Sequence, residues 1–218
     1  MQEVRESRER SEPKGIEWRK GYFFCKRSFD LLFSILVITA ILSWLLPLIA
    51  LLIRLDSRGP VFFLQKRIGK GGRPFTCYKF RTMVVNRQSD ECPARENDHR
   101  ITKMGKWLRT SNLDELPQFF NVLAGSMSLV GPRPYMVADY RRFSALVPAA
   151  SFRNLVKPGI TGMAQVKGLH GPIRDLNTIT WRYQWDAFYV QNASFRLDFR
   201  ILWLTTLLFI TQQTPLCR

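Results

Sequence analysis

Two adjacent carboxylates, Asp114 and Glu115, are the residues of this chain whose types and spacing best suit chemistry. They lie in the stretch SNLDELPQ, where Pro117 has no N–H and is tolerated only in the first turn of a helix. We therefore expect a helix that begins close to Asp114. In the simplest interpretation Ser111 or Asn112 caps this helix and the acidic residues oppose its dipole.

Basic residues near this pair favour a more specific interpretation. Arg109 precedes Asp114 by one turn, and Arg133 follows in the sequence GPRP, where two prolines hold it. Carboxylates among arginines at a helix N-terminus suit an acidic substrate held with a divalent cation. The planar fork of an arginine donates two parallel hydrogen bonds, which fits a diphosphate.

The overall charge also requires an anionic partner. The 218 residues carry 33 Lys and Arg against 17 Asp and Glu, a formal net charge of +16. Nucleic acid, anionic lipid headgroups and a phosphorylated substrate all satisfy this requirement. The four cysteines are far apart and only two histidines accompany them, so we expect reduced thiols and no zinc site.

An uncharged apolar run from Leu31 to Ile53 is long enough to cross a bilayer as a helix. Pro47, shortly after Ser43, is expected to break or kink it. Basic residues flank both ends, and the positive-inside rule then places both ends on the cytoplasmic side. We therefore predict a helix-break-helix that enters one leaflet and returns, with the Ser43 hydroxyl helping to satisfy the freed backbone groups.

The remaining elements predict an α+β fold that is mostly helical with a small β-hairpin. The hairpin spans 59–81 around a glycine-rich turn, and its second strand turns Lys79 either toward a bound anion or toward solvent. Residues 163–166 are expected to be a short strand or extended segment. We divide the chain into a flexible extension (1–20), a re-entrant membrane anchor (21–55) and a catalytic domain (56–218). Further helices are expected over 101–109, 135–147, 176–190 and 197–210.

Two of these helices are candidates for the membrane surface. Residues 101–109 form a basic amphipathic pattern that suits an interface with anionic headgroups. Residues 197–210 are strongly apolar, and fit either a helix in the interface plane or a core helix.

Taken together, these stretches resemble the bacterial sugar transferase family, the polyisoprenyl-phosphate hexose-1-phosphate transferases, also called monotopic phosphoglycosyl transferases. The resemblance is closest in size and layout to the short enzymes that begin exopolysaccharide or capsule synthesis. It covers nearly all of the chain from Lys26 to about Arg200, and its motifs follow in order. The matching stretches are 26–30, 59–63, 65–69, 78–83, 110–121, 127–134 and 157–166.

The resemblance implies transfer of a sugar-1-phosphate from a UDP-sugar to undecaprenyl phosphate, with release of UMP. Asp114 would attack the sugar-side phosphorus to form a covalent intermediate, Glu115 would hold Mg²⁺, and Arg133 would bind the diphosphate. The expected location is the cytoplasmic face of the bacterial inner membrane, in contact with lipids and with a homodimer as a possible assembly. Further substrate-binding candidates in the matching stretches are Lys79, Arg109, Pro132, Gln165, Lys26 and Arg27.

Some positions depart from the family pattern. Ser126 stands where the family usually has Asp, which would weaken any support that this side chain gives to the GPRP loop. Asp186 matches an acidic position of the family. The segment 168–185 matches loosely, so the sugar is left open.

Two other classes of function remain as alternatives. A basic, membrane-associated nucleic-acid-binding protein would explain the charge, although no helix-turn-helix, zinc or RNA-recognition motif is present and we expect no nucleic acid partner. A non-catalytic membrane scaffold would use Asp114 and Glu115 only as a helix cap. A family member with different chemistry, such as transfer of an amide sugar, is a third possibility.

Overall fold

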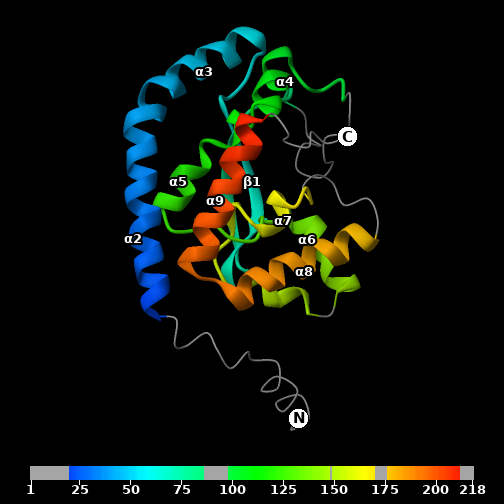
Figure 1. Ribbon diagram of the computed structural model, residues 1–218. Helices are drawn as coiled ribbons and strands as arrows, with labels where there is room; N and C mark the ends of the chain where they lie inside the picture. The colour runs from blue at the N-terminus through cyan, green and yellow to red at the C-terminus, as the bar shows by residue number, and fades with distance from the viewer. Residues whose placement is uncertain (1–19, 86–97, 148, 170–175, 212–218) are drawn as a thin grey trace.

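A computed structural model describes residues 20–85, 98–147, 149–169 and 176–211. Over these residues the protein is mostly helical, with two small two-stranded sheets (Figure 1). This confirms the predicted α+β class. Nearly all of the expected N-terminal extension (1–20) lies outside the described residues.

The apolar run forms a long, bent helix along one side of the molecule (Figure 1). Helix α2 (Lys20–Val37) continues through the π-helical segment η2 (Ile38–Leu42) into α3 (Ser43–Asp56), which contains Pro47. At the junction the Ser43 N–H bonds to the Ile38 carbonyl, and the Ser43 hydroxyl donates to the Thr39 carbonyl at 2.7 Å. The Ser43 hydroxyl therefore bonds a backbone carbonyl as predicted, while the helix bends and continues through Pro47 without a break.

This bent helix carries much of the exposed apolar surface. The continuous stretch Gly21–Asp56 is long and apolar enough to cross a membrane by length and composition. Its window of highest hydropathy is only 17% buried within the protein. Large apolar side chains such as Leu36 and Trp44 are accordingly exposed.

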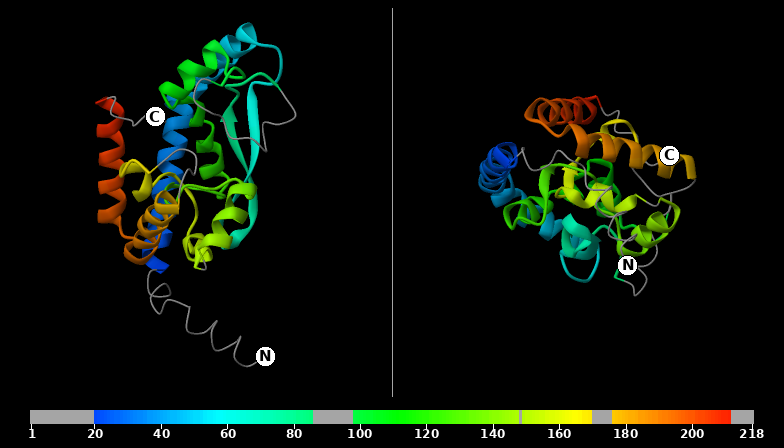
Figure 2. Two further views of the ribbon diagram at one scale, coloured as in Figure 1. Left: turned by 90° about the vertical axis from the view of Figure 1, so that its right-hand side faces the viewer. Right: turned by 90° about the horizontal axis from the view of Figure 1, so that it is seen from below.

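The predicted hairpin is confirmed. Strands β1 (Phe62–Ile68) and β2 (Pro74–Phe80) pair antiparallel, with Phe63 opposite Lys79. The turn contains Gly71 and Gly72 at φ of 68° and 75°, a left-handed conformation that favours glycine. The hairpin and the C-terminal helix lie on opposite sides of the molecule (Figure 2).

A second, parallel sheet lies in the core and was missed from the sequence. Strand β3 (Ser128–Val130) pairs with β4 (Gly159–Thr161), and the GPRP loop follows β3 directly. Here two backbones approach closely: a Cβ added to Gly159 would lie 2.1 Å from the Gly131 nitrogen. The largest buried cluster surrounds this sheet and includes Met127, Leu129, Val130, Met163, Tyr189 and Ile201.

The other helices surround this core. All four expected helices are confirmed, and each end lies within two residues of the predicted one. The prediction for 163–166 was wrong, because this segment is a helical turn (α7) in contact with the last two helices. In chain order the elements are α4 (Lys103–Thr110), η4 (Leu113–Glu115), α5 (Gln118–Leu123), α6 (Val137–Leu146), η5 (Ala150–Leu155), α7 (Met163–Val166), α8 (Leu176–Asn192) and α9 (Phe195–Ile210).

Candidate active site

Asp114 and Glu115 lie in the short 3₁₀ turn η4, between α4 and α5. The predicted capping arrangement is wrong in detail, since α5 begins at Gln118 and no side chain caps either element. The Ser111 hydroxyl instead donates to the Trp107 carbonyl at 2.9 Å, which closes the preceding helix. Asn112 adopts a left-handed φ of 54°, so the chain turns sharply before it presents the two carboxylates.

Glu115 is the centre of a cluster of charges. Its Oε1 accepts hydrogen bonds from Lys79 Nζ and Arg133 Nη2, both at 2.6 Å, and its Oε2 accepts from Arg133 Nη1 at 3.1 Å. The Glu115 side chain is 17% exposed. Burial alone would raise its pKa, but Arg133 and Lys79 hold the pKa well below its ordinary range. Glu115 is therefore ionised at neutral pH and joins β2 to the GPRP loop.

Asp114 has a different environment from its neighbour. Burial raises the pKa of Asp114, Lys79 opposes this shift, and the negative charge of Glu115 adds to it. The residue is only half-buried, and within the described part of the chain no hydrogen bond engages its carboxylate. A partly exposed carboxylate surrounded by cations, with no partner of its own there, is the group in this site most available to a substrate.

Arg109 reaches the same region from α4. Its Nε donates to the hydroxyl of Thr82 at 2.8 Å, just beyond the end of β2. Together with Lys79 and Arg133, it acts electrostatically on Asp114 and lowers its pKa. The structure thus brings together five of the predicted residues: Asp114, Glu115, Lys79, Arg109 and Arg133.

Pro132 and Gln165 lie near the second sheet, and their contacts are with its backbone. Pro132 is buried, and its carbonyl accepts from the Gly159 N–H at 3.1 Å. Gln165 lies on α7 and donates to the Ile160 carbonyl at 3.0 Å, while its Oε1 is buried without a partner in the described structure. Both residues shape the base of the GPRP loop, and neither bonds to the carboxylates.

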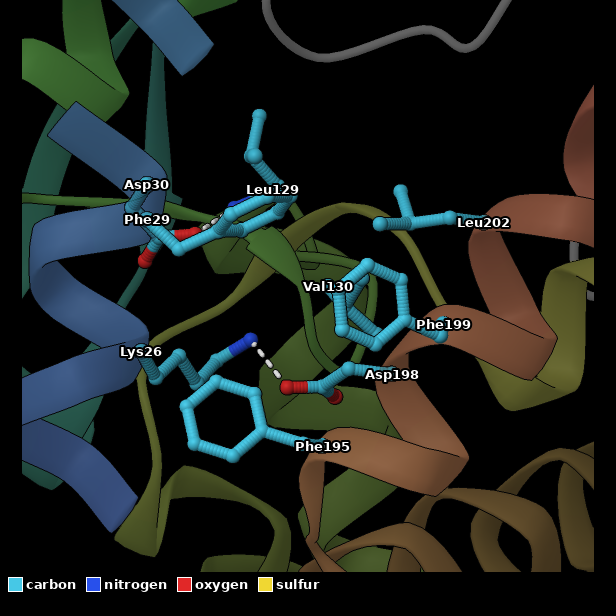
Figure 3. Close-up of a pocket in the computed structure, with 9 residues that line it drawn as sticks. All are labelled: Lys26, Phe29, Asp30, Leu129, Val130, Phe195, Asp198, Phe199 and Leu202. Atoms are coloured by element: carbon cyan, nitrogen blue, oxygen red, sulfur yellow. Dashed lines mark hydrogen bonds and ion pairs between the residues drawn. The ribbon is translucent and has the colours of Figure 1, made fainter. Parts of the chain in front are cut away.

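Lys26 and Arg27 make their contacts outside the cluster around Asp114 and Glu115. Lys26 forms a buried ion pair with Asp198 at 2.9 Å, in a small pocket between α2, β3 and α9 (Figure 3). Arg27 donates to the Val122 and Leu123 carbonyls at 2.6 and 3.0 Å, at the end of α5. In this structure the two side chains attach the membrane-type helix to the rest of the protein.

Two other contacts position the site. The Asn121 side chain pairs with the free edge of β2: its Oδ1 accepts from the Tyr78 N–H at 2.8 Å and its Nδ2 donates to the Thr76 carbonyl at 2.7 Å. This fixes α5 against the strand that carries Lys79. The Ser126 hydroxyl donates to the Asn121 carbonyl at 3.1 Å, so its contact is with the end of α5.

The residues present fit a divalent cation that is shared with a phosphorylated ligand. Among the described residues no group of three or more His, Cys, Asp or Glu side chains gathers to enclose a metal. Mg²⁺, however, is commonly held by only one or two carboxylates together with substrate phosphates and water. Asp114 and Glu115 supply such oxygens, and Glu115 is charged.

Comparisons with known proteins find relatives that match most of this chain. The chain is 44% identical over 181 residues to a UDP-glucose:undecaprenyl-phosphate glucose-1-phosphate transferase of Klebsiella pneumoniae, covering 83% of this chain and 39% of the relative. It is 42% identical over 191 residues to a UDP-N-acetylgalactosamine-undecaprenyl-phosphate N-acetylgalactosaminephosphotransferase of Aeromonas hydrophila, covering 87% and 44%. The chain therefore spans well under half the length of these relatives.

A shorter relative matches over nearly its full length. It is the exopolysaccharide production protein PSS of Rhizobium leguminosarum bv. phaseoli, which is 41% identical over 196 residues, covering 86% of this chain and 96% of the relative. Residues 21–212 also match the family described as bacterial sugar transferase, a range that includes every residue of the charged cluster. The chain belongs to the bacterial sugar transferase family.

Proposed function

We propose that the protein transfers a hexose-1-phosphate from a UDP-sugar to undecaprenyl phosphate and releases UMP, as the first membrane step of exopolysaccharide or capsule synthesis. The observation that carries this proposal is the Asp114–Glu115 pair within the cluster of Lys79, Arg109 and Arg133. The names of the relatives support the donor and acceptor classes.

In the first step an Asp114 oxygen attacks the sugar-side phosphorus of the donor. The new bond joins Asp114 to that phosphorus, and the bond from the phosphorus to the bridging oxygen breaks, so UMP leaves with the electron pair. A carboxylate is a poor nucleophile toward an anionic diphosphate unless nearby charge is neutralised. Lys79, Arg109 and Arg133 supply that neutralisation, and the proposed role of Arg133 is to hold the diphosphate.

In the second step a phosphate oxygen of undecaprenyl phosphate attacks the same phosphorus and releases the Asp114 carboxylate. The two half-reactions take place in turn at the Asp114 carboxylate, so the site never aligns both phosphorylated substrates. Mg²⁺, held by Glu115 with phosphate oxygens, would add positive charge to the transferred group. Glu115 itself keeps Lys79 and Arg133 oriented toward the donor.

The bent N-terminal helix suits this reaction if it enters one leaflet and returns. The nucleotide sugar is dissolved in the cytoplasm, and the acceptor phosphate lies at the headgroup level. We infer that α2 and α3 hold the protein at the cytoplasmic face of the bacterial inner membrane, with α4 and α9 at the lipid surface. The exposed apolar side chains of α2 and α3 and the basic surface support this placement.

The test is intact-protein mass after the purified protein is mixed with Mg²⁺ and candidate UDP-sugars, without acceptor. We expect an added sugar-phosphate that is absent in Asp114→Asn, and the mass identifies the sugar. UMP release only in the presence of undecaprenyl phosphate, with no adduct, would mean direct transfer and would remove the nucleophilic role of Asp114. No turnover with any donor would favour the scaffold alternative, whereas unchanged activity in Asp114→Asn would remove the catalytic role of Asp114.

A further inference from the structure

The GPRP loop, residues 131–134, cannot support itself by regular backbone pairing. Pro132 and Pro134 have no N–H to donate, and a residue before proline, such as Arg133, is restricted to extended conformations. Carbonyl groups buried in such a loop need donors from elsewhere, because an unpaired buried carbonyl is costly. How Arg133 is aimed therefore depends on groups outside the loop.

Three consecutive carbonyls of the loop are held by three different elements. The Gly159 N–H of β4 donates to the Pro132 carbonyl at 3.1 Å. Arg153 Nη2 of η5 donates to the Arg133 carbonyl at 2.6 Å, and Arg67 Nη1 of β1 donates to the Pro134 carbonyl at 2.8 Å. Two of the three donors are charged, and charge-assisted hydrogen bonds are the stronger kind.

Arg153 is itself held rigidly. Its Nε and Nη2 donate to Asp186 Oδ2 of α8 at 3.0 and 2.8 Å, and both side chains are 2% exposed. Its guanidinium carbon lies 4.0 Å from the centre of the Tyr135 ring. A buried, paired and stacked guanidinium has little conformational freedom. It therefore holds the loop at a fixed position relative to α8.

The contact from Arg153 falls on the backbone of the residue whose side chain binds Glu115, the neighbour of the candidate nucleophile. The Arg133 carbonyl is bonded to Arg153, while the Arg133 guanidinium makes two hydrogen bonds to Glu115. We propose that Arg153, fixed by Asp186, is a positioning residue that aims Arg133 at the diphosphate of the sugar nucleotide. This inference rests on the proposed function, in which Arg133 binds the donor.

The central variant is Arg153→Lys, which keeps the positive charge beside Asp186 but has one ammonium instead of a fork that bonds two partners. If the bond to the Arg133 carbonyl is lost, we expect kcat/KM for the UDP-sugar to fall roughly 10- to 100-fold. In ping-pong kinetics kcat/KM for undecaprenyl phosphate reports the second half-reaction alone, and we expect it to change less than about threefold. A purely structural role would reduce the active fraction and lower both values equally.

A double-mutant cycle then tests whether Arg153 acts through Arg133. In the Arg133→Ala background, Arg153→Lys should have almost no further effect on kcat/KM for the donor, because the side chain to be aimed is gone. The matched control is Arg81→Lys, since Arg81 also holds backbone carbonyls, those of Ser57, Arg58 and Pro60, but in the segment after α3. The effects of Arg81→Lys and Arg133→Ala on kcat/KM for the donor should be multiplicative.

Multiplicative effects of Arg153→Lys and Arg133→Ala would overturn the positioning role. If Arg153→Lys does not fold, Asp186→Asn replaces it in the same cycle, because it keeps the acceptor but removes the charge that fixes Arg153. Failure of the proposed function is recognised separately, as absence of wild-type turnover. Intersecting initial-velocity lines in the wild type would remove the covalent intermediate, while the cycle would still test Arg153.

Discussion

At the scale of single residues, the site depends on two neighbouring carboxylates being made chemically different. Glu115 accepts hydrogen bonds from two cations and its pKa is lowered, whereas Asp114 is half-buried and its pKa is raised. A pair of titratable groups whose environments push their pKa values apart is a frequent sign of divided roles in a catalytic site. Here Glu115 is suited to organise the cations and Asp114 to react.

The raised pKa of Asp114 has a consequence for the pH dependence of adduct formation. Asp114 must be ionised to attack, so the rate should fall as pH drops through a value above that of an ordinary aspartate. Among the cations, Lys79 lowers the pKa of Asp114 most strongly, so Lys79→Met should raise it further and move this acid limb to higher pH. The measurement is the pH profile of adduct formation by intact-protein mass.

The control for this prediction is Lys66→Met, because Lys66 lies on the same hairpin but is exposed and bonds only to the Thr76 hydroxyl among the described residues. It should leave the acid limb in place. A limb that moves to lower pH in Lys79→Met would contradict the electrostatic account of Asp114.

A separate prediction concerns the role of Glu115 in holding the metal. Glu115→Gln keeps the shape of the side chain but removes the charge that a divalent cation needs. The Mg²⁺ concentration for half-maximal adduct formation should rise by roughly tenfold or more, and removal of Mg²⁺ by EDTA should stop adduct formation in the wild type. Asp139→Asn, which removes a half-buried carboxylate from α6, should leave the Mg²⁺ dependence unchanged, and an equal shift in both variants would show that Glu115 does not hold the metal.

At the scale of elements, the site depends on α4 packing directly against the strand end at Thr82. A Cβ added to Gly105 would lie 2.0 Å from the Thr82 carbonyl oxygen, a backbone atom that cannot rotate away. Gly105→Ala should therefore displace α4, and with it Arg109 and the turn that carries Asp114. We expect a loss of about 1 to 3 kcal/mol in unfolding free energy and more than a tenfold loss of activity, measured by denaturation and UMP release.

Gly21→Ala provides the matched control, since no atom lies within 4 Å of its added Cβ. Replacing a helical glycine by alanine should leave the stability unchanged or raise it by up to about 1 kcal/mol. Equal stability and activity of Gly105→Ala and the wild type would show that α4 does not position the site.

Elements that depend on local signals could be predicted from the sequence, whereas elements that depend on contacts between distant residues could not. The hairpin depends on local signals and is present. The break expected at Pro47 is not present, because α3 runs through Pro47 and the distortion lies at the π-helical segment Ile38–Leu42. The parallel pair of β3 and β4 was missed because each strand has three residues and its partner lies about 30 residues away. Residues 163–166 were predicted as a short strand or extended segment after a turn-rich stretch, and their local sequence says nothing of the helices packed against them.

The charged residues of the site could be predicted from the sequence, but the contacts that hold them in place could not. The Asp-Glu pair and Arg133 carry local motifs, so they were found. Lys26 was named as a substrate-binding candidate from the family resemblance. Its contact in the structure, Asp198, lies 172 residues further along the chain, so no local signal indicates it. Arg153 was missed because its ion-pair partner, Asp186, lies 33 residues away and no local signal in the sequence indicates the pair.

At the scale of the whole molecule, the bent helix and the charge distribution make a prediction about membrane topology. The chain has a net charge of +16, and basic residues flank both ends of the apolar stretch. A straight span would place one basic end on the far side of the membrane, against the positive-inside rule. The helix contains the π-helical segment and Pro47, and α3 leaves the line of α2 (Figure 1). We therefore expect both ends to lie on the cytoplasmic side.

This topology can be measured by labelling single cysteines in inside-out and right-side-out membrane vesicles. With the native cysteines replaced, Gly21→Cys and Arg58→Cys, one at each end of the bent helix, should both react with a membrane-impermeant maleimide in inside-out vesicles only. Pro47→Ala restores a backbone donor and should favour a straighter helix, so a fraction of Arg58→Cys should become reactive from the opposite side. Labelling of the two wild-type ends from opposite sides would mean that the helix spans the membrane, and the catalytic face would then need another way to reach its cytoplasmic donor.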